Sequence, residues 1–292
     1  MLSRIKSLYT PCEWEQILSS FHTQKKVCVF LNALKSGAKD LEEEFLGQGL
    51  EFRKINAYCY LFKAQDKSIL SSMKAFGEFK FYIQNYSSYL CALNLEVKAG
   101  QSVLDLCAAP GGKSINLANF MQNTGYLACN ELSKDRFFTL QKNLKNYGVN
   151  AKIFMKDGKN IGKLCPLKFD KILLDAPCST FAKIGFDLEK SYKEIKNLAK
   201  TQKKLLHSAL KALKIGGELV YSTCTFTREE NEEVIENALK SEFKLELLDI
   251  DLENVKAKAG QSENFAEISK CRRILPSADY DGFFIAKLRK CS

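Results

Sequence analysis

Residues 104–114 read L-D-L-C-A-A-P-G-G-K-S, and this stretch decides the fold class. It continues an apolar run that starts at Val103, passes through Gly111-Gly112 and opens a helical pattern through Leu117. A strand that leads through glycines into a helix is where an open parallel sheet binds its ligand. The spacing fits neither the G-x-x-x-x-G-K-[ST] phosphate loop nor the G-x-G-x-x-G fingerprint. We therefore predict an α/β sheet that holds another kind of ligand at this turn.

Strand and helix patterns alternate from this stretch to the end of the chain. Strands are predicted at Val103–Cys107, Leu127–Asn130, Ala151–Met155, Ile172–Leu174, Glu218–Thr223, Phe243–Ile250 and Gly282–Leu288. Helices are predicted through Phe137 and Leu144, over roughly 189–213 with Gly216-Gly217 as its end, and after a capping box at Thr227–Glu230. Repeated strand–helix units of this length predict a parallel sheet with helices on both faces.

Acidic residues follow three of these strands, at Glu131, Asp157 and Asp175. The carboxyl ends of parallel strands meet at one edge of a sheet, so the three carboxylates should face the same cleft. An acid after the second strand can accept both hydroxyls of a ribose. Each acid alone is also explained by turn and cap chemistry. Together with the glycine turn, they favour a nucleoside-containing cofactor.

Composition narrows the class of protein. The 292 residues are 46% hydrophobic and carry a net charge of +10, which suits a core-forming protein that meets a polyanion such as nucleic acid. No apolar run approaches the 18 or so residues of a membrane helix, and the first residues lack the pattern of a signal peptide, so we expect a cytoplasmic protein. The eleven cysteines include no C-x-x-C pair, which argues against structural zinc, and we expect most to be reduced and buried.

Two cysteines stand out by their setting. Cys178 lies in D-A-P-C-S-T directly after a strand, and Cys224 lies in Y-S-T-C-T after another. With L-D-L-C-A-A-P-G-G-K, N-E, Q-N-Y-S-S and D-G-F-F-I-A-K-L, these motifs closely resemble the RNA cytosine-5 methyltransferase family of the Fmu/Sun and NOL1/NOP2/Sun group. The resemblance covers residues 77–290 well and residues 1–76 more weakly, where V-F-L-N-A-L-K matches the preceding module of that family.

The resemblance implies S-adenosylmethionine as the methyl donor and a Rossmann-like methyltransferase sheet whose last strand is antiparallel. It implies that Glu131 holds the ribose, that Asp157 lies by the adenine, and that Asp175 sits between cofactor and target base. The full implied cofactor set is Cys107, Ala108, Ala109, Pro110, Gly111, Gly112, Lys113, Glu131, Arg136, Asp157, Gly158 and Asp175. It also implies a small α+β RNA-binding module at 1–76 and a catalytic domain at 77–292, with no metal.

The chemistry of cytosine explains why such an enzyme needs a thiol. Carbon 5 becomes nucleophilic only after a thiolate has added to carbon 6, which makes this a case of covalent catalysis. By resemblance, Cys224 attacks carbon 6 and Cys178 assists release of the adduct. Asp175 and Lys113 could stabilise the charge that develops on the base. The sequence leaves the protonation states of these two side chains open.

Other functions remain compatible with parts of the pattern. An RNA-binding assembly factor could keep the fold without turnover, although Lys113, Asp175, Cys178 and Cys224 are all present. A DNA cytosine-5 methyltransferase would use the Pro-Cys pair alone, and a small-molecule methyltransferase has little use for paired cysteines. The family usually has Gly where this chain has Thr180, so the choice of target is open between ribosomal and transfer RNA.

Overall fold

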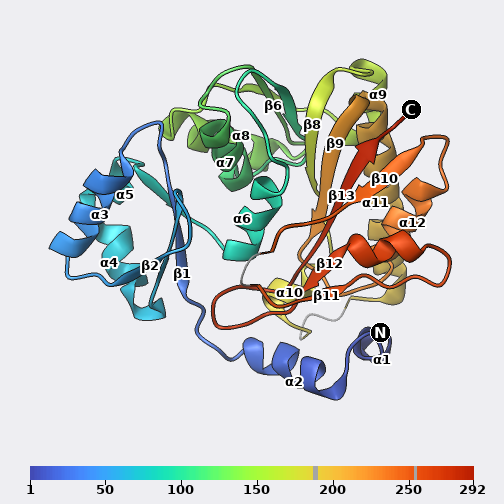
Figure 1. Cartoon of the computed structure of the whole chain (residues 1–292), viewed down its shortest axis with the longest axis horizontal. Coiled ribbons are helices and arrows are strands. Elements are labelled where there is room, and N and C mark those ends of the chain that lie inside the picture. Colours follow the sequence, from blue (N-terminus) through green and yellow to red (C-terminus); the bar gives the residue numbers. More distant parts are fainter. Residues whose placement is uncertain (187–189, 253–254) are drawn as a thin grey trace.

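The computed structural model describes residues 1–186, 190–252 and 255–292, and it is dominated by one nine-stranded mixed sheet (Figure 1). The strand order is β11-β12-β13-β9-β8-β5-β6-β7, and β10 also pairs with β13. The strands are β5 (Ser102–Asp105), β6 (Tyr126–Asn130), β7 (Lys152–Phe154), β8 (Phe169–Asp175), β9 (Leu213–Thr223), β10 (Leu245–Leu248), β11 (Ala257–Ala259), β12 (Arg272–Ile274) and β13 (Phe283–Lys290). Strands β5 to β9 are parallel and β13 is antiparallel to β9, which confirms the predicted Rossmann-like sheet.

Helices cover both faces of this sheet, because successive residues of a strand point to opposite sides. Val103 packs in one hydrophobic cluster with Leu140, whereas its neighbour Leu104 packs in another with Leu206. Figure 1 accordingly shows α7 and α8 on one side of the sheet and α11 and α12 on the other. The helices of this domain are α6 (Tyr86–Leu93), α7 (Gly112–Phe120), α8 (Lys134–Asn146), α9 (Ile161–Leu164), α10 (Phe181–Ile184), α11 (Tyr192–Ala212) and α12 (Glu232–Leu239). None of the helices in the described ranges is long and apolar enough to cross a membrane.

A separate antiparallel sheet precedes the large one, with the order β2-β3-β1-β4. Its elements are β1 (Val27–Leu31), α3 (Ala38–Gly47), β2 (Phe52–Lys54), β3 (Cys59–Phe62), α4 (Lys67–Ser72), α5 (Lys74–Gly77) and β4 (Phe81–Ile83). Phe45 of α3 packs against Phe62, with the two ring centroids 4.8 Å apart. Because β4 pairs with β1, the sheet extends beyond residue 76. The functional division into 1–76 and 77–292 stays a prediction.

The first two helices, α1 (Leu2–Lys6) and α2 (Pro11–Ser20), pack on the domain of the large sheet rather than on the small sheet (Figure 1). Ile5, Trp14 and Ile17 share a buried cluster with Phe181 and other residues of that domain. The ring of Trp14 also stacks on Phe186, with 5.4 Å between centroids. Residues 1–20 therefore brace the segment that follows the D-A-P-C-S-T motif.

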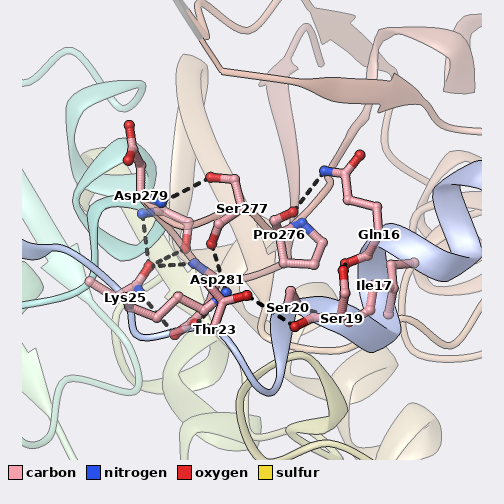
Figure 2. Close-up of polar contacts among 12 residues, drawn as sticks. Gln16, Ile17, Ser19, Ser20, Thr23, Lys25, Pro276, Ser277, Asp279 and Asp281 are labelled. Carbon is pink, nitrogen blue, oxygen red and sulfur yellow. Dashed lines mark hydrogen bonds and ion pairs between the residues drawn. The ribbon is translucent and has the colours of Figure 1, made fainter. Parts of the chain in front are cut away.

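Helix α2 and the chain that follows it are both hydrogen-bonded to the loop at residues 276–281 (Figure 2). Gln16 Nε2 donates a hydrogen bond to the carbonyl of Pro276 at 2.7 Å, and Lys25 Nζ donates one to the carbonyl of Ser277 at 2.7 Å. This loop leads into Asp281, just before β13. The N-terminal segment thus fixes the position of a loop that reaches the candidate site.

Two expectations about local structure are wrong. Gly216-Gly217 does not end the long helix: α11 ends at Ala212, and the next residue, Leu213, is fully buried and already pairs with Phe169 of β8. The glycines lie inside β9, whose second half is the predicted strand. The predicted first residue of that helix, at 189, falls outside the described residues.

The capping box predicted at Thr227–Glu230 does not form either. Helix α12 begins at Glu232, and its N-cap, Asn231, makes no capping hydrogen bond through its side chain. Instead Thr227 Oγ1 donates a hydrogen bond of 2.8 Å to Glu230 Oε2. The Glu230 carboxylate turns inward because buried donors from other segments also bind it, as described below.

A buried ion pair connects α12, β12 and the first helices. Arg273 is 3% exposed, and its guanidinium binds the carboxylate of Glu232 through two nitrogens, one of them 2.6 Å from Oε1. Its Nη1 donates to the hydroxyl of Tyr9 at 3.0 Å and to the carbonyl of Phe226 at 2.9 Å. Since Phe226 lies two residues after Cys224, this pair also supports the loop that carries the cysteine.

Replacing Arg273 alone should therefore be strongly destabilising. Arg273→Met leaves the Glu232 carboxylate, 1% exposed, without its cation, and such a loss costs about 3–5 kcal/mol of unfolding free energy. The double variant Arg273→Met/Glu232→Leu should recover much of this loss, because no charge is then stranded. Urea unfolding measures both, with Arg272→Met as a neighbouring control. Equal losses in the single and double variants would contradict the argument.

Candidate active site

The glycine turn brings the backbone of residues 107–112 against the edge of the sheet. Gly111 adopts φ +115°, a conformation in the left-handed region that side chains disfavour. At Gly112 a Cβ atom would lie 2.8 Å from the Tyr82 ring and 2.9 Å from Gln84 Oε1, so any side chain would collide there. Both glycines are thus required by geometry, and α7 starts directly at the turn.

Two cavities meet at this edge of the sheet. The larger has a volume of about 600 Å³ and is lined by residues that include Cys107, Ala109, Glu131, Arg136, Asp157, Gly158, Asp175, Cys178 and Cys224. The smaller, of about 310 Å³, is lined by residues that include Cys107, Ala108, Ala109, Pro110, Gly112, Lys113, Asp175 and Cys224. Cys107, Ala109, Asp175 and Cys224 belong to both, so these residues mark the junction. Of the predicted residues only Gly111 lines neither cavity, since it faces Leu140.

Glu131 presents a free acceptor to the larger cavity. Its side chain is 5% exposed, and Oε1 accepts a hydrogen bond from the Ser133 amide at 2.9 Å. Oε2 is 3.4 Å from Arg136 Nη2 but has no hydrogen-bond partner. Arg136 itself donates to the carbonyl of Ala109 at 2.7 Å, which ties the glycine turn to α8. A buried carboxylate oxygen without a hydrogen bond suits a ligand that brings a hydroxyl donor.

Asp105 presents a second carboxylate oxygen without a hydrogen bond, and this residue lines the smaller cavity. Its side chain is 1% exposed, Oδ2 accepts a hydrogen bond from Ser114 Oγ at 2.6 Å, and Oδ1 has no partner. Burial raises the pKa of Asp105 to about 7. A ligand with an ammonium group would satisfy Oδ1 and stabilise the ionised form. Asp105 and Glu131 together therefore fit S-adenosylmethionine, which carries an ammonium group at one end and ribose hydroxyls at the other.

A buried lysine and aspartate stand at the junction of the cavities. Lys113 Nζ donates hydrogen bonds to Asp175 Oδ2 at 2.7 Å and to Ser88 Oγ at 2.5 Å. Ser222 Oγ donates to the other carboxylate oxygen of Asp175 at 2.8 Å. Burial lowers the pKa of Lys113, but the carboxylate of Asp175 outweighs this effect and the pKa lies above its ordinary value. This direction favours the ammonium form of Lys113, which lines the smaller cavity together with Cys224.

The two cysteines of the motifs lie side by side. Cys178 Sγ and Cys224 Sγ are 3.4 Å apart. A hydrogen bond from Cys178 lowers the pKa of the Cys224 thiol despite its burial, and Lys113 acts in the same direction. The same hydrogen bond, together with burial, raises the pKa of Cys178. The arrangement thus favours the thiolate at Cys224, and a thiolate is the nucleophilic form of cysteine.

Sequence reasoning missed the residue that holds both cysteine loops. Glu230 is fully buried, and Oε1 accepts hydrogen bonds from the Ser179 amide at 2.8 Å and from Gln202 Nε2 at 3.0 Å. Oε2 accepts from Thr227 Oγ1 at 2.8 Å and from Ser179 Oγ. Gln202 also donates to the carbonyl of Pro177 at 2.8 Å. The only sequence signal for the Glu230 carboxylate was the pattern Thr227–Glu230, which was wrongly interpreted as a capping box.

Asp281 is a second missed residue. It lines the smaller cavity together with Asn85, whose Nδ2 donates to Asp281 Oδ2 at 2.7 Å. Lys25 Nζ lies 4.0 Å from Asp281 Oδ1, and Figure 2 shows the lysine and the aspartate facing each other. Burial raises the pKa of Asp281, although Lys25 opposes this. The sequence did contain a signal for both residues, because Asn85 belongs to the motif Q-N-Y-S-S and Asp281 to the motif D-G-F-F.

Comparison with known proteins places the chain in a family. Residues 92–289 match the family model described as 16S rRNA methyltransferase RsmB/F. A mouse mitochondrial tRNA (cytosine(34)-C(5))-methyltransferase is 37% identical over 80% of this chain and 70% of its own length. A Pyrococcus horikoshii tRNA (cytosine(72)-C(5))-methyltransferase is 37% identical over 76% of this chain and 55% of its own length.

A solved structure agrees with these matches. A methyltransferase homologue from Pyrococcus horikoshii superposes with a TM-score of 0.83 at 33% identity, covering 94% of this chain and 90% of the other. Ribosomal RNA small subunit methyltransferase F of Vibrio atlanticus is 40% identical over 72% of this chain, which spans only 45% of that relative. The family match and the shared fold together cover the glycine turn and both cysteine motifs. This chain is a member of the RsmB/F family of RNA methyltransferases.

Proposed function

We propose that this protein transfers a methyl group from S-adenosylmethionine to carbon 5 of a cytosine in ribosomal or transfer RNA. The observation that carries the proposal is the pair of sulfur atoms, 3.4 Å apart, at the junction of two cavities and beside the Lys113–Asp175 pair. The cofactor extends across both cavities, with its ribose in the larger and its ammonium group in the smaller, and a flipped base enters at the junction. A protein that only bound RNA would have no need for this arrangement of thiols and charges.

The cofactor supplies a methyl group bound to a positively charged sulfur, and the residues of the chain position it. Glu131 Oε2 accepts from the ribose hydroxyls, and Asp157, which lines the far part of the larger cavity, lies by the adenine. Asp105 Oδ1 accepts from the ammonium group, and the backbone of residues 107–112 surrounds the methionine end. This places the methyl donor next to the residues shared by the two cavities.

The residues at the junction act on the base. The Cys224 thiolate adds to carbon 6 of the cytosine, so that carbon 5 gains the electron pair and takes up the methyl group. The ammonium of Lys113 stabilises the negative charge that develops on the ring during the addition, and Asp175 holds this ammonium in position through their ion pair. A base then takes the proton from carbon 5, and its bonding electrons re-form the ring double bond as the Cys224 sulfur leaves carbon 6 as a thiolate. Cys178 assists this release.

The remaining parts of the proposal concern the partner and the compartment. All eleven cysteines are free thiols, as is usual in a reducing compartment, and we place the reaction in the cytoplasm. We assign RNA binding to the small module at 1–76 and to the catalytic domain at 77–292. The relatives named above act on ribosomal or on transfer RNA, and the proposal covers both.

The two cysteines provide the decisive test. Cys224→Ala should abolish methyl transfer and any covalent protein–RNA adduct, because no nucleophile remains. Cys178→Ala should still attack and methylate, but release should stall, so an adduct should persist on denaturing gels. Each variant is incubated with total RNA and cofactor, and Cys165→Ala, a half-buried cysteine outside the site, serves as the control.

Two results would contradict this assignment of roles. An adduct formed by Cys224→Ala would place the nucleophile elsewhere. A folded Cys178→Ala protein that formed no adduct and methylated normally would remove Cys178 from the reaction. Absence of methyl transfer by the wild type, on RNA extracted from a strain without the enzyme, would overturn the proposed function itself.

The Asp105 carboxylate should lower the stability of the cofactor-free protein but strengthen cofactor binding. Its pKa is about 7 in the folded protein and about 3.9 in an unfolded chain, so the wild type loses stability as the pH rises between these values. Relative to Asp105→Asn, the wild type should lose about 2 kcal/mol of unfolding free energy between pH 5 and pH 8 without cofactor. Asp105→Asn should also bind S-adenosylmethionine about tenfold or more weakly, since a charged hydrogen bond is lost.

Denaturant unfolding at several pH values and calorimetry with the cofactor measure these two effects. Ser114→Ala is a suitable control, because it removes the neighbour of Oδ2 and leaves Oδ1 in place. Cofactor affinity that is the same in Asp105→Asn and in the wild type would rule out contact between Asp105 and the ammonium group.

A further inference from the structure

Helix α11 concentrates the positive charge of the protein. Its 21 residues contain six lysines and one glutamate, a net charge of +5 in a chain whose total is +10. Three of these lysines, Lys200, Lys203 and Lys204, follow one another along the middle of the helix and are called the lysine ridge here. Lys196 and Lys163 extend the ridge at either side, and both are exposed.

The lysine ridge carries charge that the described residues do not neutralise. No carboxylate of the described residues forms an ion pair with Lys200, Lys203 or Lys204. Lys200 and Lys204 are four residues apart, as are Lys196 and Lys200, and like charges at this spacing destabilise a helix. A surface that costs stability in the free protein is expected to bind a polyanion.

The small module differs in this respect. Several of its basic side chains have acidic partners, for example Lys54 with Glu42 at 2.7 Å and Lys63 with Glu51 at 2.5 Å, whereas Lys35, Lys39 and Lys67 form no ion pair among the described residues. These pairs are exposed and contribute little stability, but they reduce the charge that the module offers to a polyanion. The unpaired charge of the described residues is therefore greater on α11 than on the sheet of the module.

The lysine ridge adjoins the active site. Thr201 and Leu205 of the same helix line the larger cavity, and Gln202 contacts the Cys178 loop. Lys203 and Lys204 line a neighbouring hollow of about 540 Å³, together with Lys159, Lys163 and His207. Asp157 and Lys159 belong to the linings of both the hollow and the larger cavity. A strand bound along the ridge is thus close to the loop that carries Cys178.

We propose that the lysine ridge, with Lys163, binds the sugar–phosphate backbone of the RNA substrate. The inference rests on the proposed function and adds the path of the RNA, which runs over α11 as well as over the small module. Lysine ammonium groups contact phosphates without reading bases, so the ridge contributes affinity and not the choice of cytosine. Together with Lys196, the ridge covers about 12 Å along the helix, at about 1.5 Å per residue.

The test compares two triple variants with the same change in charge. K200Q/K203Q/K204Q removes the lysine ridge, and glutamine keeps a high helix propensity. K134Q/K142Q/K145Q removes three exposed lysines from α8, which covers the opposite face of the sheet (Figure 1). Binding of a labelled single-stranded RNA of 20 nucleotides is measured by fluorescence anisotropy over a series of salt concentrations, once with cytosines and once without.

The ridge variant should bind both RNAs several-fold more weakly at low salt. Its slope of log affinity against log salt should be smaller by about 2, since each phosphate contact with a single strand contributes about 0.7. The α8 variant should bind like the wild type. Calorimetry should give both variants the cofactor affinity of the wild type, which shows that the fold is intact.

Other outcomes overturn the inference. Equal losses in the two variants would mean that only total charge matters, and a loss in the α8 variant alone would place the RNA on the other face. A ridge variant that binds like the wild type, while the wild type methylates RNA, overturns the ridge and leaves the proposed function standing. A wild type that neither binds nor methylates RNA overturns both.

Discussion

One buried carboxylate holds the reacting part of this protein together. Glu230 receives hydrogen bonds from the segment after Cys178, from α11 and from the segment after Cys224. Buried inside the protein, it has no water to replace a lost partner, so the three segments must keep their relative positions. The separation of the two sulfur atoms, and with it the lowered pKa of Cys224, follows from this constraint.

The central sheet could be predicted from the sequence because its strands are buried on both faces. Such strands are short apolar runs, and the residues that follow them meet at one edge, which is why Glu131, Asp157 and Asp175 line one cavity. Two short antiparallel strands at one end of the sheet carry no such signal: β11 and β12 have three residues each and were not predicted. The prediction that Gly216-Gly217 ends α11 was wrong because the helix ends where Leu213 pairs with Phe169 of β8, and not at a glycine cap.

The residues that carry the chemistry were easier to find than those that support them. Cys178 and Cys224 stand in distinctive motifs, and the structure brings them together. Glu230 and Arg273 act through partners far away in the sequence, and no local pattern reports such contacts. Asp105 lies inside the quoted glycine motif, but only its burial and its unpartnered oxygen distinguish it from an ordinary strand residue.

The contact between Tyr9 and Arg273 has a consequence for how the protein is made. The two residues are 264 positions apart, and at about 5–20 residues per second a ribosome needs roughly ten seconds or more to synthesise the chain between them. For that time Tyr9 and α2 have been made, while their partners, Arg273 and the 276–281 loop, have not. Asp281 and Phe283, which complete the wall of the smaller cavity, are made later still. The growing chain therefore has no finished site until the ribosome has passed residue 283.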